Sequence, residues 1–150
     1  MSAEKSLSAT IDELLERPYW VVDPLPEQVP EGGRGQFFAV ERLYLLPPRY
    51  EELRRRFADI LLKLNCYYDF TVVRDEADAG AVNPAPEELV HWVVDGSLHL
   101  NIVVGPDEAL IALGCDDMCM TVYGPSEKLL ERVRKLAEAN GVFVWQSPER

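Results

Sequence analysis

The sequence has few residues suited to covalent chemistry and no stretch suited to membrane insertion. It holds two histidines and three cysteines, and no apolar run approaches the ~18 residues of a membrane-spanning helix. The first residues lack the basic start and apolar stretch of a secretory signal. An odd cysteine count without a framework spacing is typical of free thiols in a reducing compartment. We therefore expect a cytoplasmic protein without disulfides and without membrane contact.

Length and composition are those of one folded domain. A chain of 150 residues is long enough to bury roughly 70% of the surface that its unfolded form exposes. Apolar residues make up 47% and charged residues 27% of the chain, which argues against disorder and fibrous repeats. The acidic loop after Val73 separates elements that each need the other's apolar face. We therefore predict a single α+β domain over residues 1–150.

Lysine and arginine are absent from residues 75–127, although this segment contains eleven acids. These are Asp75, Glu76, Asp78, Glu87, Glu88, Asp95, Asp107, Glu108, Asp116, Asp117 and Glu127. The other residues hold 15 acids and 15 bases, so this segment carries the whole net charge of −11. Clustered acids repel phosphate groups, which excludes nucleic acid as the expected partner. The acids either keep the domain soluble or form a surface for a basic protein partner.

Hydrophobic periodicity and chain breakers predict the element order αββαβαβββαβ. The expected helices cover residues 11–17 with Thr10 as the cap, 50–64, 87–94, and a last helix between Ser126 and Asn140. The expected strands cover residues 19–22, 36–46, 66–73, 98–104, 109–113, 118–123 and 142–145. This order predicts one mixed, mostly antiparallel sheet with helices packed on one face.

A candidate chemical cluster lies around the turn between the predicted strands over residues 109–113 and 118–123. Cys115 and Cys119 have a CxxxC spacing around Asp116 and Asp117, and His99 starts a nearby strand. These thiols could bind zinc together with His99 or Cys66, but structural zinc sites usually supply two close-spaced ligand pairs. Neither histidine lies in a known catalytic motif. We therefore expect no metal, no cofactor and no catalytic residue.

Basic residues gather on and near the predicted long helix. They are Arg42, Arg49, Arg54, Arg55, Arg56 and Lys63. Such a cluster could bind an anion, or the acidic face of a second copy of the chain. Against this, three pairs have the i,i+4 spacing of ion pairs on a solvated helix: Glu51 with Arg55, Glu52 with Arg56, and Asp59 with Lys63. The cluster is therefore interpreted as the exposed face of that helix.

Adjacent aromatic residues recur in three predicted strands. The pairs are Tyr19-Trp20, Phe37-Phe38 and Tyr67-Tyr68. Because neighbours on a strand point to opposite faces, one ring of each pair faces the core. The other ring is either covered by a loop or a second layer, or exposed as an interaction patch.

Three segments resemble a family of small uncharacterised bacterial proteins. They are RPYWVVDPLPEQVP at residues 17–30, LNCYYD at 64–69 and MTVYGPS at 120–126. The resemblance spans nearly the whole chain and implies a bacterial cytosolic setting. It implies no activity, cofactor or site residue.

The sequence leaves three functional hypotheses. The leading one is a non-enzymatic interaction domain, regulatory or immunity-like, that offers its acidic part to a basic protein partner. The alternative is a small enzyme or ligand-binding domain whose site is assembled near residues 115–119 and His99. The third is self-association as a homodimer through a sheet edge or an exposed aromatic face.

Overall fold

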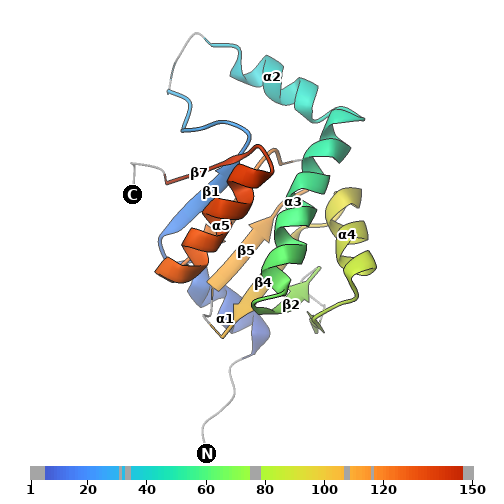
Figure 1. Ribbon diagram of the computed structural model, residues 1–150, viewed down its shortest axis with the longest axis vertical. Coiled ribbons are helices and arrows are strands. Elements are labelled where there is room, and N and C mark those ends of the chain that lie inside the picture. Colours follow the sequence, from blue (N-terminus) through green and yellow to red (C-terminus); the bar gives the residue numbers. More distant parts are fainter. Residues whose placement is uncertain are drawn as a thin grey trace, which may run out of the picture.

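The computed structural model describes residues 6–30, 32, 35–74, 79–106, 109–115 and 117–146 (Figure 1). Its helices are α1 (Leu7–Leu14), α2 (Phe37–Tyr44), α3 (Arg49–Asn65), α4 (Pro86–Asp95) and α5 (Glu127–Ala139). Its strands are β1 (Tyr19–Asp23), β2 (Asp69–Val73), β3 (Ala81–Val82), β4 (Leu100–Gly105), β5 (Ala109–Leu113), β6 (Met120–Tyr123) and β7 (Phe143–Trp145).

The seven strands form one open sheet in the order β3-β2-β4-β5-β6-β1-β7. All its pairs are antiparallel, and β4, β5 and β6 form the predicted meander. This confirms the α+β class and the single sheet. The sheet is more uniform than the mixed sheet expected, and the observed element order is αβααββαβββαβ.

Helices α3, α4 and α5 lie together on one face of the sheet (Figure 1). The main core between these layers includes Phe57 of α3, Leu89 of α4 and Ile111 of β5, all completely buried. Helix α1 is the exception to the expected arrangement, because Ile11 and Leu14 pack with Val73 and Leu110 on the opposite face. Both faces of the sheet are therefore at least partly covered.

One end of the sheet collects the ends of several strands. Strand β4 begins and β5 ends there, where Leu100 pairs with Leu113, and β1 ends there at Asp23. We call this the upper end, because it lies toward the top of Figure 1. The lower end is where Gly105 ends β4 and Ala109 begins β5. Helix α2 lies beyond the upper end, next to the start of α3 (Figure 1).

The strand predicted over residues 36–46 is wrong, since the structure has the helix α2 there. Aromatic and β-branched residues favoured a strand, but strand preference depends on packing against neighbouring strands. No strand of the described sheet pairs with this segment. Phe37, Glu41 and Tyr44 are half-buried. They are separated by four and then three residues, which places them on one face of a helix. The segment therefore gains more from one helical contact face than from an isolated extended chain.

Other boundaries shift for local reasons. The first helix starts at Leu7 rather than at 11, because Ser6 is its cap and accepts a hydrogen bond from the backbone N–H of Ala9. Strand β2 starts at Asp69, three residues later than expected, and the short β3 was missed. The last helix begins as predicted, with Ser126 accepting from the backbone N–H of Leu129. No helix among the described residues has the length and apolar character needed to cross a bilayer.

Candidate functional site

The structure brings most of the predicted chemical cluster to the upper end of the sheet. Because Leu100 pairs with Leu113, His99 lies next to the loop that contains Cys115, Asp117 and Cys119. Asp116, the fifth predicted residue, lies outside the described residues. A Cβ atom placed on Gly114 would meet the Asp117 carboxyl and would lie 3.4 Å from Nδ1 of His99. A histidine and a carboxylate therefore flank one backbone position, and both side chains are exposed.

The Cys119 thiol of this cluster does not suit catalysis. Burial raises the pKa of Cys119 to about 12, and the negative charges of Asp23, Asp117 and Glu41 add to the rise. A thiol with such a pKa stays protonated at neutral pH, whereas nucleophiles and zinc ligands are thiolates. Cys66 lies at the end of α3, near the lower end of the sheet, and so does not join Cys115 or Cys119. Across the residues placed by the structure, no three histidine, cysteine, aspartate or glutamate side chains are grouped to hold a metal.

A buried arginine supports this end of the sheet, and the sequence interpretation missed it. Arg54 is completely buried, although it was assigned to the exposed basic face of the helix. Its Nε donates to the carbonyl of Val93 at 2.7 Å and its Nη1 to the carbonyl of Gly114 at 2.9 Å. Its guanidinium also lies 5.3 Å from the ring centre of Tyr50. Arg54 thus ties α3 to α4 and to the loop after β5.

A signal for the burial of Arg54 was present in the sequence. Position 54 lies three and four residues before Phe57 and Ala58, on the apolar stripe of the helix. Two of the three predicted ion pairs on the exposed side are confirmed. Arg55 pairs with Glu51 at 3.0 Å, and Lys63 pairs with Asp59 at 3.1 Å. The basic cluster therefore divides into the buried Arg54, which bonds to backbone carbonyls, and exposed residues such as Arg55 and Lys63.

A cavity of about 680 Å³ lies at the upper end, between the end of β1 and the start of α2. Its apolar lining includes Leu25, Val29, Pro30, Phe37, Phe38 and Trp145. Its polar lining includes Asp23, Glu27 and Gln28. The cavity exists because β7 pairs with β1, which sets Trp145 opposite Val21, two residues before Asp23. The hollow thus joins residues of the segment from Asp23 to Phe38 with the distant Trp145.

The carboxyl of Asp23 is the unusual group in this cavity, because it is buried with an exposed fraction of only 7%. Its Oδ1 accepts a hydrogen bond from the backbone N–H of Leu25 at 3.1 Å. Burial raises the pKa of Asp23, and the charge of Glu41 adds to the rise, while the Leu25 N–H and the Trp145 indole partly oppose it. The buried Nε1 of Trp145 reaches no acceptor with good hydrogen-bond geometry in the described chain. Among the placed residues, no cationic side chain forms an ion pair with Asp23.

Helix α2 carries an apolar surface beside this cavity. None of its residues is buried, and the exposed fraction of Phe38 reaches 76%. Val40 and Leu43 of the same helix and Leu46 just after it are also exposed. The rings of Phe37 and Phe38 stand edge to face with their centres 5.4 Å apart. These four residues are spread around the exposed side of α2 and the turn after it, and we call Phe38, Val40, Leu43 and Leu46 together the α2 patch.

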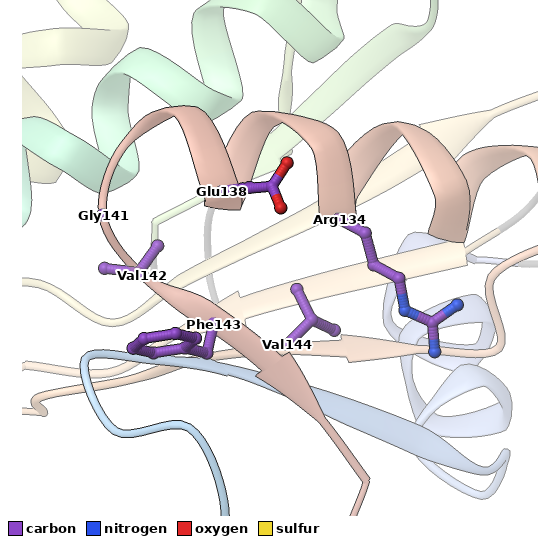
Figure 2. A pocket seen from close by; sticks show the side chains of 6 residues that line it. All are labelled: Arg134, Glu138, Gly141, Val142, Phe143 and Val144. Carbon is purple, nitrogen blue, oxygen red and sulfur yellow. The ribbon is translucent and has the colours of Figure 1, made fainter.

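A second hollow, of about 330 Å³, lies between α5 and β7 (Figure 2). Figure 2 shows Val144 pointing from β7 toward α5, while Phe143 points away from the helix. Its charged lining is Arg134 and Glu138, which are one helical turn apart and exposed. This hollow therefore offers a shallow surface along a sheet edge and no buried titratable group.

The acidic segment is divided between the two ends of the sheet. Asp95 and Asp117 lie at the upper end, near Arg54 and Gly114. Glu87, Glu88 and Glu127 begin α4 and α5 near the lower end. The other six acids of the segment lie outside the described residues. The five placed acids therefore do not share one face.

Comparison of the chain with family models, with curated proteins and with solved structures finds no match.

Proposed function

We propose that this chain is an interaction domain without catalytic activity, and that it binds a basic protein partner at the upper end of the sheet. The observation that carries the proposal is the α2 patch beside a carboxylate-containing cavity. An isolated helix as short as α2 is marginal in water, and its stability normally comes from packing an apolar face. Phe38, Val40, Leu43 and Leu46 find little such packing within the chain. A partner that covered these side chains would supply it.

Charge favours a basic partner over a neutral or acidic one. Asp23 and Glu27 line the cavity, while on α2 itself the charges of Glu41 and Arg42 offset each other. Residues 75–127 carry the net charge of −11, and their Asp95 and Asp117 lie at the same end of the sheet, so this charge attracts cationic proteins and speeds their association at low salt. Apolar anchors surrounded by charge are the usual composition of a specific protein interface.

The enzyme hypothesis has weaker support. His99 and Asp117 are close together, but both are exposed, so neither is held in the water-poor setting that tunes catalytic groups. Cys119 is a protonated thiol at neutral pH. Ligand binding, the other half of the alternative, is better supported at the Asp23 cavity than at residues 115–119.

The test compares capture of proteins from the source cells by three immobilised chains: wild type, Phe38→Asp/Leu43→Asp, and Val82→Asp. Val82 is a matched control, because it is an exposed apolar residue on β3, at the sheet edge opposite β7. We expect a basic protein to bind wild type and the control, and to elute as salt rises. The double variant should bind it at least about 100-fold more weakly, because two apolar anchors are lost and charges replace them.

The same protein binding equally to all three chains would show that the partner does not use the α2 patch. Sedimentation of wild type at several concentrations distinguishes the third hypothesis. A dimer that Phe38→Asp/Leu43→Asp dissociates would mean that a second copy covers the patch. Monomers at every concentration would leave the patch free for a different protein.

A further inference from the structure

We propose that the Asp23 cavity receives one cationic side chain of the partner, a lysine or an arginine, with the Asp23 carboxylate as its counter-ion. This rests on the proposed function, because it names the group that the upper end of the sheet recognises. The volume of about 680 Å³ lies within the range of ligand pockets and exceeds what one side chain needs. Space therefore remains for the residues that flank the cation on the partner.

The walls of the cavity match the two parts of such a side chain. Phe37, Phe38 and Trp145 contribute aromatic rings, and Leu25 and Val29 contribute aliphatic surface. An alkyl stem packs against aliphatic and aromatic groups, while an ammonium or guanidinium head is attracted to ring faces. The lining thus accepts the apolar and the charged part of one long basic side chain.

The carboxyl of Asp23 selects for positive charge. Isolated buried carboxylates are rare, because burial without a counter-ion costs much of their hydration free energy. Asp23 is buried, oriented by the N–H of Leu25, and has no cationic partner among the described side chains. A cation entering the cavity would compensate this charge, whereas a neutral guest would not. An anionic guest would be repelled by Asp23 and Glu27 together.

Binding of the cation is coupled to the protonation of Asp23. The titratable groups that face Asp23 are Glu41 from α2 and Cys119 just before β6, and Glu27 shares the cavity lining. Burial places the pKa of Asp23 above the ordinary value of an aspartate, and a bound cation would lower that pKa. The affinity for cations should therefore fall as the pH drops through the pKa of Asp23.

The test uses three small probes: n-butylammonium, n-butylguanidinium and the neutral n-butanol. Binding is followed at neutral pH by the NMR signal of the Trp145 indole N–H, assigned with Trp145→Phe. We expect both cations to bind at least about tenfold more tightly than butanol, because charged hydrogen bonds exceed neutral ones in strength. Asp23→Asn should abolish this preference, and Glu27→Gln, which changes another carboxylate of the same cavity, should largely keep it. Equal binding of butanol and the cations, or an unchanged preference in Asp23→Asn, would overturn the proposal.

Urea unfolding of Asp23→Asn provides a second readout. An acid whose pKa is raised by folding contributes stability below its unfolded pKa, and this contribution is lost as the pH rises through the folded pKa. The amide cannot ionise and keeps an oxygen for the Leu25 N–H. The variant should therefore unfold at a higher urea concentration than wild type at neutral pH, and this gain should vanish in acid. If Asp23→Asn is less stable than wild type at neutral pH, the claim that the buried Asp23 carboxylate lacks a counter-ion in the free chain is contradicted.

The affinity of the two variants for the partner distinguishes failure of this inference from failure of the proposed function. If Asp23→Asn binds the partner as tightly as wild type but Phe38→Asp/Leu43→Asp does not, the α2 patch docks the partner and the cavity does not hold its side chain. If neither variant affects the partner, both proposals fail. The partner should also displace n-butylammonium from the Trp145 signal. If the partner and n-butylammonium bind at the same time, the cavity binds a free amine and not a side chain of the partner, and the proposal is overturned.

Discussion

Replacing Arg54 with methionine should lower the free energy of unfolding by about 2–4 kcal/mol. Methionine fills much of the same space but donates no hydrogen bond, so the buried carbonyls of Val93 and Gly114 lose their donors. Each buried polar group left without a partner costs about 1–3 kcal/mol, partly offset because a buried guanidinium is itself costly. Equilibrium urea unfolding measures the difference.

The matched control for this prediction is Arg55→Met on the next position of α3. Arg55 is exposed and pairs with Glu51, so its loss should change the free energy of unfolding by less than about 1 kcal/mol. An Arg54→Met variant as stable as Arg55→Met would mean that the two carbonyls find other donors. The loop after β5 would then not depend on Arg54.

Alkylation of the native protein by iodoacetamide should leave Cys119 unmodified long after Cys66 and Cys115 have reacted. Cys66 and Cys115 are exposed, whereas Cys119 is half-buried with a pKa of about 12. A pKa of about 12 in place of the ordinary 9.0 reduces the thiolate fraction about 1,000-fold, and the greater nucleophilicity of a more basic thiolate recovers about 20- to 30-fold. The pKa alone therefore slows Cys119 by about 40-fold, and burial adds to this.

Mass spectrometry of digested protein, sampled over time, gives the rate at each cysteine. The rate at Cys119 should keep rising with pH throughout the mildly alkaline range, because its thiol titrates only near pH 12. Unfolding in urea should make the three rates similar, which serves as the control for intrinsic reactivity. Fast labelling of native Cys119 at neutral pH would indicate an activated thiolate and would revive the enzyme hypothesis for residues 115–119.

The sequence predicted best those elements whose signals are local. Helix α5 follows from the Ser126 cap and a strong apolar stripe, and β5 was predicted with its observed bounds. His99 lies beside the loop after β5 because Leu100 pairs with Leu113, and consecutive strands with short connections pair as neighbours. Helix caps and the pairing of consecutive strands could therefore be predicted from the sequence.

The Asp23 cavity was missed because its parts meet only through non-local pairing. Asp23 and Trp145 come together since β7 adds to the free edge of β1, and nothing in the chain order fixes that position. In the sequence, Asp23 reads as a polar strand end before a proline. The cavity also needs α2, and aromatic content made residues 36–46 look like a strand. A test for helical spacing of Phe37, Glu41 and Tyr44 would have found the helix.

The docking of a basic partner on α2 and the Asp23 cavity is tested most directly by hydrogen exchange of the chain with and without the captured protein. We predict slower amide exchange in α2 and in residues 25–29, because the partner would cover the α2 patch and the cavity rim. Exchange in β3 and at the start of α4, near the lower end of the sheet, should not change. Protection confined to β3 and α4, with α2 exchanging as in the free chain, would contradict the proposed function.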